Sequence, residues 1–223
     1  MITSPHNETL KLVRKLHSRR WRDKLGLFVA EGEDLVDAAF EAGIEPVELL
    51  VAGETVAPEL LAQVSMLPHP ASVIGVFRRD DLPAFEPRPV ALSLWRIGDP
   101  GNVGTLIRTA DAFGAAVELS VGCADPTGPK ALRASAGALF RVPVGESAGQ
   151  RIGLVAHGAK PLGEVEFGEA TVFVVGSERE GLPQEALARC DVVATIPTPG
   201  PAESLNVAAA GAIALYEWSR RSD

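Results

Sequence analysis

Residues 196–210 read Ile196-Pro-Thr-Pro-Gly200-Pro-Ala-Glu-Ser204-Leu205-Asn206-Val-Ala-Ala-Ala210, and they decide the architecture of the C-terminal half. The apolar run at 191–196 predicts a buried strand, and the Pro- and Gly-rich stretch after it predicts a stiff loop. Ser204 and Asn206 stand where a helix begins, in position to cap free backbone N–H groups. The helix that follows is rich in Ala and Gly, so other parts of the chain can pack very close to it.

Three further stretches accompany this segment: Asn102-Val-Gly-Thr-Leu-Ile-Arg108-Thr-Ala-Asp-Ala-Phe-Gly114, Asp125-Pro-Thr-Gly-Pro-Lys130-Ala-Leu-Arg133-Ala-Ser-Ala-Gly137 and Gly176-Ser-Glu178-Arg-Glu-Gly181-Leu-Pro183. In this order they resemble the motifs of the SpoU (TrmH-like) family of RNA 2'-O-ribose methyltransferases, within the SPOUT superfamily. The resemblance is strong over residues 90–218. Over residues 4–78 it is weaker and is to the ribosomal-protein-like α/β domain that many members carry. It implies an α/β fold with a parallel sheet and a C-terminal trefoil knot, a rare feature in proteins.

The composition of the 223 residues suits one or two globular domains, with 46% hydrophobic residues. No apolar run approaches the ~18 to 20 residues of a membrane span, and the polar start lacks the apolar core of a secretory signal. We therefore expect no membrane partner and a cytoplasmic location. Cys123 and Cys190 are too few for a disulfide framework or a four-ligand zinc site, and we expect two small buried residues. The four histidines are scattered, so no metal site is expected, and the absence of G-x-G-x-x-G disfavours a Rossmann-type enzyme.

The charge is unevenly distributed along the chain. Residues 1–24 hold seven basic and two acidic side chains, a net charge of +5, which leaves −13 for the rest of a chain whose total is −8. A basic arm on an acidic body is typical of a nucleic-acid partner, although a solvated helix face would look the same. The RNA substrate of the resembled family favours the first interpretation. The predicted RNA contacts are Lys11, Arg14, Arg19 and Arg22, with Lys130 and Arg133 in the second rank.

The Pro-rich, polar residues 79–89 are the best domain boundary in the chain. We predict an RNA-recognition domain at 1–78, a linker at 79–89 and a methyltransferase domain at 90–223. Predicted strands lie at 27–30, 46–52, 74–77, 90–95, 117–121, 152–156, 172–175 and 192–196. Predicted helices lie at 10–16, 33–42, 57–63, 103–113, 129–139, 183–190 and after 206. Near-continuous apolar strands between helices indicate a mainly parallel, two-sided sheet. The path from Val144 to Ile152 stays open, because about a dozen residues are usual in a parallel crossover.

The resemblance assigns catalytic positions to Arg108, Asn102, Glu178, Ser204 and Asn206. Taken alone, Arg108 would be a surface arginine of a helix, Asn102 a helix N-cap and Glu178 a turn carboxylate. A guanidinium is a poor proton acceptor, so the safer mechanism has Arg108 grip the phosphate beside the target ribose. A phosphate oxygen could then share the proton of the 2'-hydroxyl. The bolder alternative uses a deprotonated Arg108 as the direct base.

The resemblance also implies S-adenosylmethionine as the methyl donor. It places Gly176, Ile196 and Leu205 against that cofactor, with Gly176 allowing close approach to the ligand. Sequence alone would make Ile196 and Leu205 ordinary core residues.

The predicted activity is therefore that of a SAM-dependent RNA 2'-O-ribose methyltransferase acting on large-subunit rRNA. A first alternative is a tRNA 2'-O-ribose methyltransferase, and a second is a non-catalytic RNA-binding or ribosome-assembly protein on the same fold. The presence of all five catalytic positions speaks against lost catalysis. A homodimer through the C-terminal domain is expected, since the last helix offers a close-packing surface. Neither the modified nucleotide nor a housekeeping or resistance role follows from the sequence.

Overall fold

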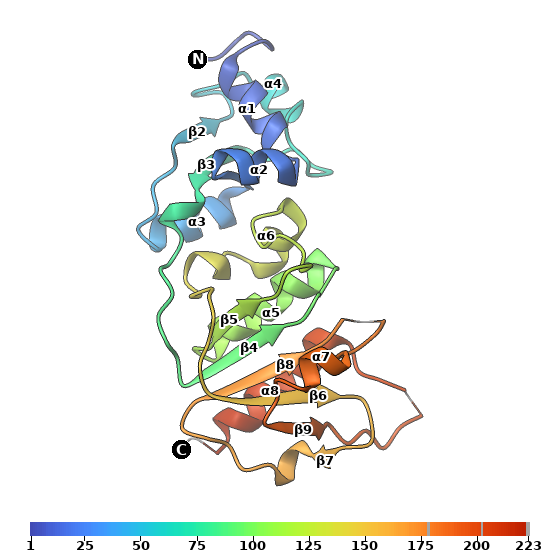
Figure 1. Cartoon of the computed structure of the whole chain (residues 1–223). Coiled ribbons are helices and arrows are strands. Elements are labelled where there is room, and N and C mark those ends of the chain that lie inside the picture. Colours follow the sequence, from blue (N-terminus) through green and yellow to red (C-terminus); the bar gives the residue numbers. More distant parts are fainter. Residues whose placement is uncertain (178, 202, 222–223) are drawn as a thin grey trace.

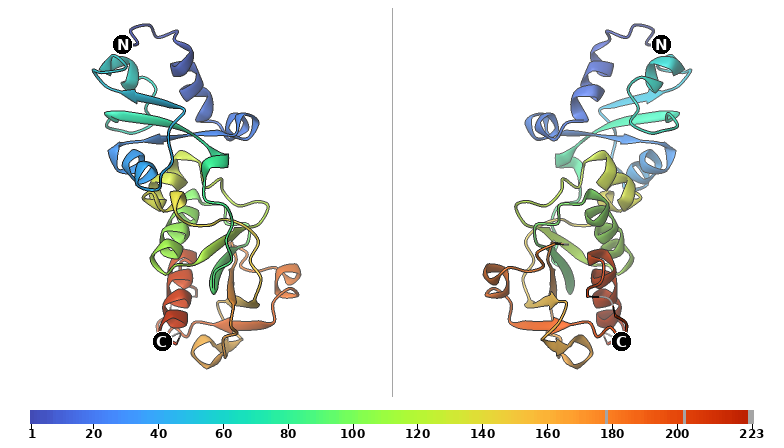
Figure 2. Two further views of the ribbon diagram at one scale, coloured as in Figure 1. Left: turned by 90° about the vertical axis from the view of Figure 1, so that its left-hand side faces the viewer. Right: turned by 90° about the vertical axis from the view of Figure 1, so that its right-hand side faces the viewer.

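In the computed structural model, which describes residues 1–177, 179–201 and 203–221, the described chain forms two separate sheets (Figure 1). The two views at right angles show an elongated molecule, with the N-terminus at one end and the last helix at the other (Figure 2). The smaller sheet belongs to the N-terminal part and the larger one to the C-terminal part.

The N-terminal sheet is antiparallel, with the strand order β1-β3-β2. Its strands are β1 (Leu27–Glu31), β2 (Glu48–Val51) and β3 (Val73–Arg78). Its helices are α1 (Glu8–Leu16), α2 (Arg19–Leu25), α3 (Glu33–Glu41) and α4 (Pro58–Ala62), and the short 3-10 helix η1 (Arg79–Asp81) follows β3. The predicted helical spacing of Leu10, Val13 and Leu16 is confirmed, because all three are buried on one side of α1.

The C-terminal sheet has the strand order β5-β4-β8-β6-β9-β7, and every pair in it is parallel. Its strands are β4 (Val90–Leu94), β5 (Ala116–Leu119), β6 (Gln150–Val155), β7 (Lys160–Pro161), β8 (Thr171–Val175) and β9 (Val192–Thr195). Its helices are α5 (Pro100–Ala112), α6 (Pro129–Ser135), α7 (Gln184–Leu187) and α8 (Val207–Ser219). The parallel sheet confirms the fold class that the apolar strands predict.

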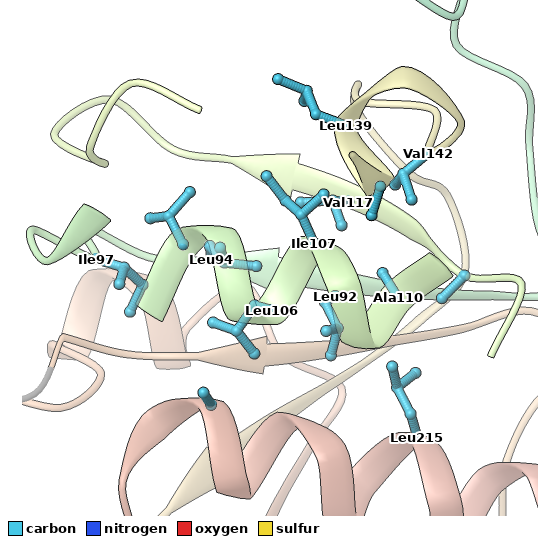
Figure 3. Close-up of a cluster of buried hydrophobic side chains, with 14 of the residues drawn as sticks. Leu92, Leu94, Ile97, Leu106, Ile107, Ala110, Val117, Leu139, Val142 and Leu215 are labelled. Carbon is cyan, nitrogen blue, oxygen red and sulfur yellow. The ribbon is translucent and has the colours of Figure 1, made fainter. Parts of the chain in front are cut away.

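Small residues let α5 pack closely against both α6 and α8. A Cβ atom added to Gly104 would lie 2.2 Å from the backbone oxygen of Ala131 on α6. A Cβ added to Gly211 of α8 would lie 2.4 Å from a methyl carbon of Leu106 on α5. Figure 3 shows α5 above α8, with Leu106 and Leu215 between the two helices. At Gly211 of the Ala- and Gly-rich final helix the close neighbour is thus a side chain, whereas the close approach of backbone occurs at Gly104 of α5.

The structure differs from the sequence prediction in several places. The helix predicted at 129–139 ends at Ser135, because Ala136 and Gly137 both adopt the left-handed conformation, and a short 3-10 helix η2 (Ala138–Phe140) follows. Strand β7 is two residues long and too short to give a pattern. Val144 is not part of a strand and makes only an isolated bridge with Val117. The few residues from Val144 to Ile152 therefore do not have to form a crossover between two parallel strands.

An aromatic cluster joins the two parts of the chain. Phe28 and Phe77 come from the small sheet and Phe140 comes from η2, and their ring centroids lie 5.6 to 6.0 Å apart. All three rings are buried in one hydrophobic core that also contains Leu92 and Leu106. Close by, Gly137 lies against Ala38, whose Cβ would be 2.4 Å from a Cβ added at Gly137. The core is thus continuous across the Pro-rich segment.

Candidate active site

A cavity of about 550 Å³ opens at the carboxyl ends of β6, β8 and β9. In open α/β sheets, ligands bind at this edge of the parallel strands. Four segments contribute residues to the cavity wall: 154–156 at the end of β6, 175–177 and 179–182 at the end of β8 and after it, Ile196 and Thr198 after β9, and 204–207 with Ala210 at the start of α8. Residues up to 56 positions apart in the sequence therefore meet around one space.

Five of the predicted site residues line this cavity. They are the three predicted cofactor contacts and two of the predicted catalytic residues: Gly176, Ile196, Leu205, Ser204 and Asn206. The predicted site residues did not include Arg179 and Thr198, which also line the cavity, although both lie within the quoted motifs. The predicted catalytic residue Glu178 lies outside the described residues.

Gly176 contributes to the cavity wall through close packing of the protein backbone. A Cβ added there would lie 2.2 Å from the backbone carbon of Gly181 and 2.5 Å from the backbone nitrogen of Leu182. The chain folds back at this point, since Gly181 N donates to the backbone oxygen of Ser177 at 2.9 Å. The missing side chain therefore makes room for a tight turn in the cavity wall. It allows close approach of the protein backbone, and close approach of the ligand to Gly176 stays a prediction.

Asn206 fixes the start of α8 and points toward α5. Its Oδ1 accepts hydrogen bonds from Ala208 N at 2.9 Å and Ala209 N at 3.3 Å, as an N-cap does. Its Nδ2 is then free to donate to the Oδ1 of Asn102, at 3.3 Å. Two of the predicted catalytic residues, 104 positions apart, are thereby joined at the rim of the cavity.

The interpretation of Asn102 as the N-cap of its helix is wrong. Helix α5 begins at Pro100, and its N-cap is Asp99, whose Oδ1 accepts from Asn102 N at 3.0 Å. The Asp99 carboxylate is bound on its other oxygen by the ammonium of Lys130, at 2.8 Å. This hydrogen bond from Lys130 lowers the pKa of the Asp99 carboxyl. Lys130, predicted as an RNA contact, thus ties α6 to the start of α5.

Arg108 lies apart from the cavity. It is exposed on α5, about 9 Å along the helix axis from Asn102, and it is absent from the cavity lining. Within the described part of the chain, its guanidinium has no hydrogen bond or ion pair. The structure therefore leaves this side chain free to take a partner from outside the chain. Arg133, at the end of α6, is likewise exposed.

Arg22 does not fit its predicted role as an RNA contact. Its side chain is 5% exposed, and Nε donates to Oδ2 of Asp125 at 2.8 Å. Nη1 donates to the backbone oxygens of Leu16 and His17, both at 2.9 Å. A phosphate has no access to a guanidinium that is bound in this way. The basic pattern of residues 1–24 could not reveal that Arg22 is paired with Asp125, which lies 103 positions further along the chain.

The partner of Arg22 also binds a second arginine. Arg79 Nη2, from η1, donates to the same Oδ2 of Asp125 at 2.8 Å, and Arg79 Nη1 pairs with Asp23 at 2.7 Å. Burial alone would raise the pKa of the Asp125 carboxyl. Hydrogen bonds from Thr127 and Arg22 and the charge of Arg79 outweigh burial and lower that pKa. We call Arg22, Arg79 and Asp125 the junction triad, because it connects the N-terminal part to the loop after β5.

The other predicted RNA contacts lie nearer the surface. Arg14 is exposed and donates to the backbone oxygen of Pro5 at 3.3 Å. Lys11 pairs with Glu8 at 2.7 Å across one turn of α1. Arg19 is exposed, although one Nη reaches the backbone oxygen of Cys123 at 3.2 Å. These three side chains remain able to contact RNA.

Other kinds of site receive no support from the described residues. Among them, no group of His, Cys, Asp and Glu side chains could hold a metal ion. Both cysteines are free thiols, with Cys123 buried and Cys190 partly buried. Of the helices in the described ranges, none is long and apolar enough to cross a membrane.

Comparison with known proteins identifies relatives over the whole chain. The sequence model of the SpoU rRNA Methylase family matches residues 89–216, and that of the MRM3-like substrate binding domain matches residues 7–79. The chain is 32% identical to the 23S rRNA (guanosine(2553)-2'-O)-methyltransferase RlmP of Bacillus subtilis, over 96% of this chain and 97% of that protein. It is also 32% identical to a 23S rRNA (uridine(2479)-2'-O)-methyltransferase of Streptomyces viridochromogenes, over 99% of this chain and 92% of the relative. A crystal structure of an AdoMet-bound rRNA methyltransferase from Sinorhizobium meliloti superposes with a TM-score of 0.87 at 28% identity, covering 98% of this chain and 97% of that one.

Proposed function

The chain belongs to the SpoU rRNA methylase family, and from this premise we propose how its residues perform the reaction and on which RNA. It is a S-adenosylmethionine-dependent RNA 2'-O-ribose methyltransferase. Its substrate is large-subunit rRNA, because the two relatives named for 23S rRNA match nearly the whole chain, including the N-terminal part. The observation that carries the proposal is the cavity, which gathers residues of two separate motifs at the carboxyl edge of the sheet.

The cavity suits the methyl donor in size and in chemistry. Its volume of about 550 Å³ falls within the roughly 300 to 1,000 Å³ of small-molecule sites. Its wall combines residues of three loops with the apolar residues Leu154, Ile196 and Leu205. Gly176, Ile196 and Leu205 would hold the donor, which supplies an activated methyl group on its sulfonium. The turn at Ser177–Gly181 would close one wall around it.

The chain's own task in the reaction is to position the ribose and to stabilise charge. The linked amides of Asn102 and Asn206 stand at the rim of the cavity with Ser204, where they would orient the 2'-hydroxyl. Arg108 would grip the neighbouring phosphate from the exposed side of α5, so that a phosphate oxygen can share the leaving proton. The part proposed for Glu178 is to hold that arginine or the substrate.

The finer architecture is also a proposal. Residues 1–78 act as the RNA-recognition domain, 79–89 as the linker and 90–223 as the methyltransferase domain, which the ranges of the two family matches support. The C-terminal segment forms a trefoil knot. Supporting this, Ile196, Thr198 and residues 204–206 line one cavity with the loop after β8, and α8 returns to pack on α5. Tracing the chain in an experimental structure tests the knot.

The assembly and location follow the same reasoning. The chain works as a homodimer through α8, where Ile213 and Tyr216 are 39 and 58% exposed and offer apolar surface to a second copy. Sedimentation would give the mass of one chain if this is wrong. The enzyme acts in the cytoplasm, where its RNA is made, and its two free thiols fit a reducing compartment. Fractionation of cells tests the location.

The decisive experiment measures methyl transfer to defined RNAs. Purified protein and labelled S-adenosylmethionine are incubated with 23S rRNA or with tRNA, each isolated from a strain that lacks this protein. We expect label in the ribose of 23S rRNA, and mapping then identifies the nucleotide. Label only in tRNA would favour the tRNA alternative. Donor binding without transfer to either RNA would favour a non-catalytic RNA-binding protein.

A further inference from the structure

A second cavity opens at the same edge of the large sheet, on the side of the N-terminal part. It has a volume of about 420 Å³ and is lined by Arg19, Asp23 and Arg79, and by residues 119–127 after β5. The donor cavity lies at the ends of β6, β8 and β9. Strand β4 stands between β5 and β8 in the sheet. Whatever follows β4 must therefore lie between the two cavities.

The residues that follow β4 are Trp95 and Arg96, and they are bonded to both sides. Trp95 N donates to the backbone oxygen of Val175, which lines the donor cavity, at 2.8 Å. Arg96 N donates to Oγ of Ser120, which lines the second cavity, at 2.8 Å. This dipeptide is a fixed bridge between the cavities.

Arg96 holds a backbone conformation that its residue type disfavours. Its φ is 51°, in the left-handed region where a Cβ is strained and glycine is the usual residue. The neighbouring loop accommodates its side chain with Gly122, at which an added Cβ would lie 3.2 Å from Arg96 Cγ. Strained residues cluster at ligand-binding and catalytic sites. If the side chain of Arg96 has a function, that function would explain why position 96 is arginine and not glycine.

Two guanidinium groups lie over the same indole. The Arg96 guanidinium is 5.8 Å from the centroid of the Trp95 ring, and that of Arg189, just after α7, is 5.6 Å away. Both arginines are exposed. The acidic group beside them is Glu185, whose Oε1 lies 3.0 Å from Arg96 Nη2, with both side chains 56% exposed. Such an exposed ion pair contributes little stability, so an RNA phosphate can replace the carboxylate.

We propose that Trp95, Arg96 and Arg189 form an RNA phosphate-binding site between the two cavities. It would hold the strand where it runs from the target ribose toward the N-terminal part. The chain as a whole carries a charge of −8, and phosphate contacts fix the register of a nucleic acid on a protein. The proposal rests on the proposed RNA methyltransferase function and adds residues outside its motifs.

The test is the salt dependence of RNA binding, measured with 23S rRNA from the strain that lacks this protein. In Arg96→Gln/Arg189→Gln, we expect the log–log salt slope to fall by roughly 1.4 to 1.8, at about 0.7 to 0.9 for each lost contact. S-adenosylmethionine affinity should stay within twofold. The control is Arg88→Gln, at the opposite end of β4, because Arg88 is also partly exposed and also pairs with a carboxylate, Glu86 at 3.6 Å. It should keep the wild-type slope.

A second variant separates binding from stability. Arg96→Gly relieves the left-handed conformation, so its Tm should equal or exceed that of the wild type, while its RNA affinity falls as in Arg96→Gln. A wild-type slope in the double variant, or an equal loss in Arg88→Gln, would overturn the site. If wild-type protein binds this RNA without methylating it, the proposed function fails, and the salt slopes still decide on the phosphate site.

Discussion

Arg22 and Arg108 show how differently the two regions of this molecule use an arginine. At the junction, Arg22 is buried and bound by Asp125 and by two backbone oxygens. On the exposed side of α5, Arg108 has no partner within the described residues. Both belong to stretches that suggest RNA binding, so charge in the sequence does not reveal which cation is available. Whether an arginine is available to RNA depends on whether a carboxylate lies next to it, and the fold sets that position.

The largest effect expected from this comparison is on catalysis. Arg108→Ala should reduce methyl transfer at least tenfold, because a group that acts in the transition state contributes to turnover. S-adenosylmethionine affinity should change by no more than a few-fold, since Arg108 is outside the donor cavity. Single-turnover assays with 23S rRNA measure the first quantity and calorimetry the second. A variant that keeps more than about a tenth of the wild-type rate contradicts the assignment, and Arg88→Ala is the control.

At the junction triad, we expect a substitution to lower the free energy of unfolding. Asp125→Ala leaves Arg22 buried without its carboxylate, and breaking a buried pair costs about 3 to 5 kcal/mol. Urea unfolding should show a loss of about 3 kcal/mol in the free energy of unfolding. The control is Asp23→Ala, because Asp23 also pairs with Arg79 but is 52% exposed, and it should cost below about 1 kcal/mol. If both variants lose the same free energy of unfolding, the buried Arg22–Asp125 pair is no more important for stability than the exposed Arg79–Asp23 pair.

RNA binding should separate the exposed basic residues from the buried one. Arg14→Gln/Arg19→Gln should lower the log–log salt slope for 23S rRNA by roughly 0.7 to 0.9 for each contact. Arg22→Gln should lower the Tm and leave that slope unchanged, because its guanidinium already has protein partners. If the double variant keeps the wild-type slope, α1 and α2 present only a solvated face.

The smallest effect concerns pH. The pKa of Asp125 is lowered in the folded chain, because hydrogen bonds and nearby arginines outweigh burial. Its contribution to stability is therefore fully present above the unfolded pKa, near 3.8, and is lost as the pH falls through the lower, folded value. The stability difference between wild type and Asp125→Asn should be constant from pH 7 to 5 and shrink below pH 4. Urea titrations at four pH values measure it, and a difference that grows toward acid contradicts the sign.

The sequence predicted what depends on local pattern or on motif resemblance. The apolar strands gave the parallel sheet, and the motifs gave five residues that the fold brings to one cavity. Contacts over long distances in the chain left no local signal. The pairing of Arg22 with Asp125 spans 103 positions, and the left-handed backbone of Arg96 follows a strand that looks ordinary. The motif around Gly176 correctly marked a part of the cavity wall. The contact between Gly176 and the backbone of Gly181 is not predictable from the sequence, because it depends on how the chain folds back.

The aromatic cluster of Phe28, Phe77 and Phe140 has a consequence for how this enzyme can evolve. A recognition module that is joined only by a linker can be exchanged between enzymes as a unit. Here an exchange would leave Phe140 and the Ala38-facing surface of Gly137 without their partners. The two parts must therefore change together, and they should open together in native-state hydrogen exchange, with β1 and β4 protected by the same free energy.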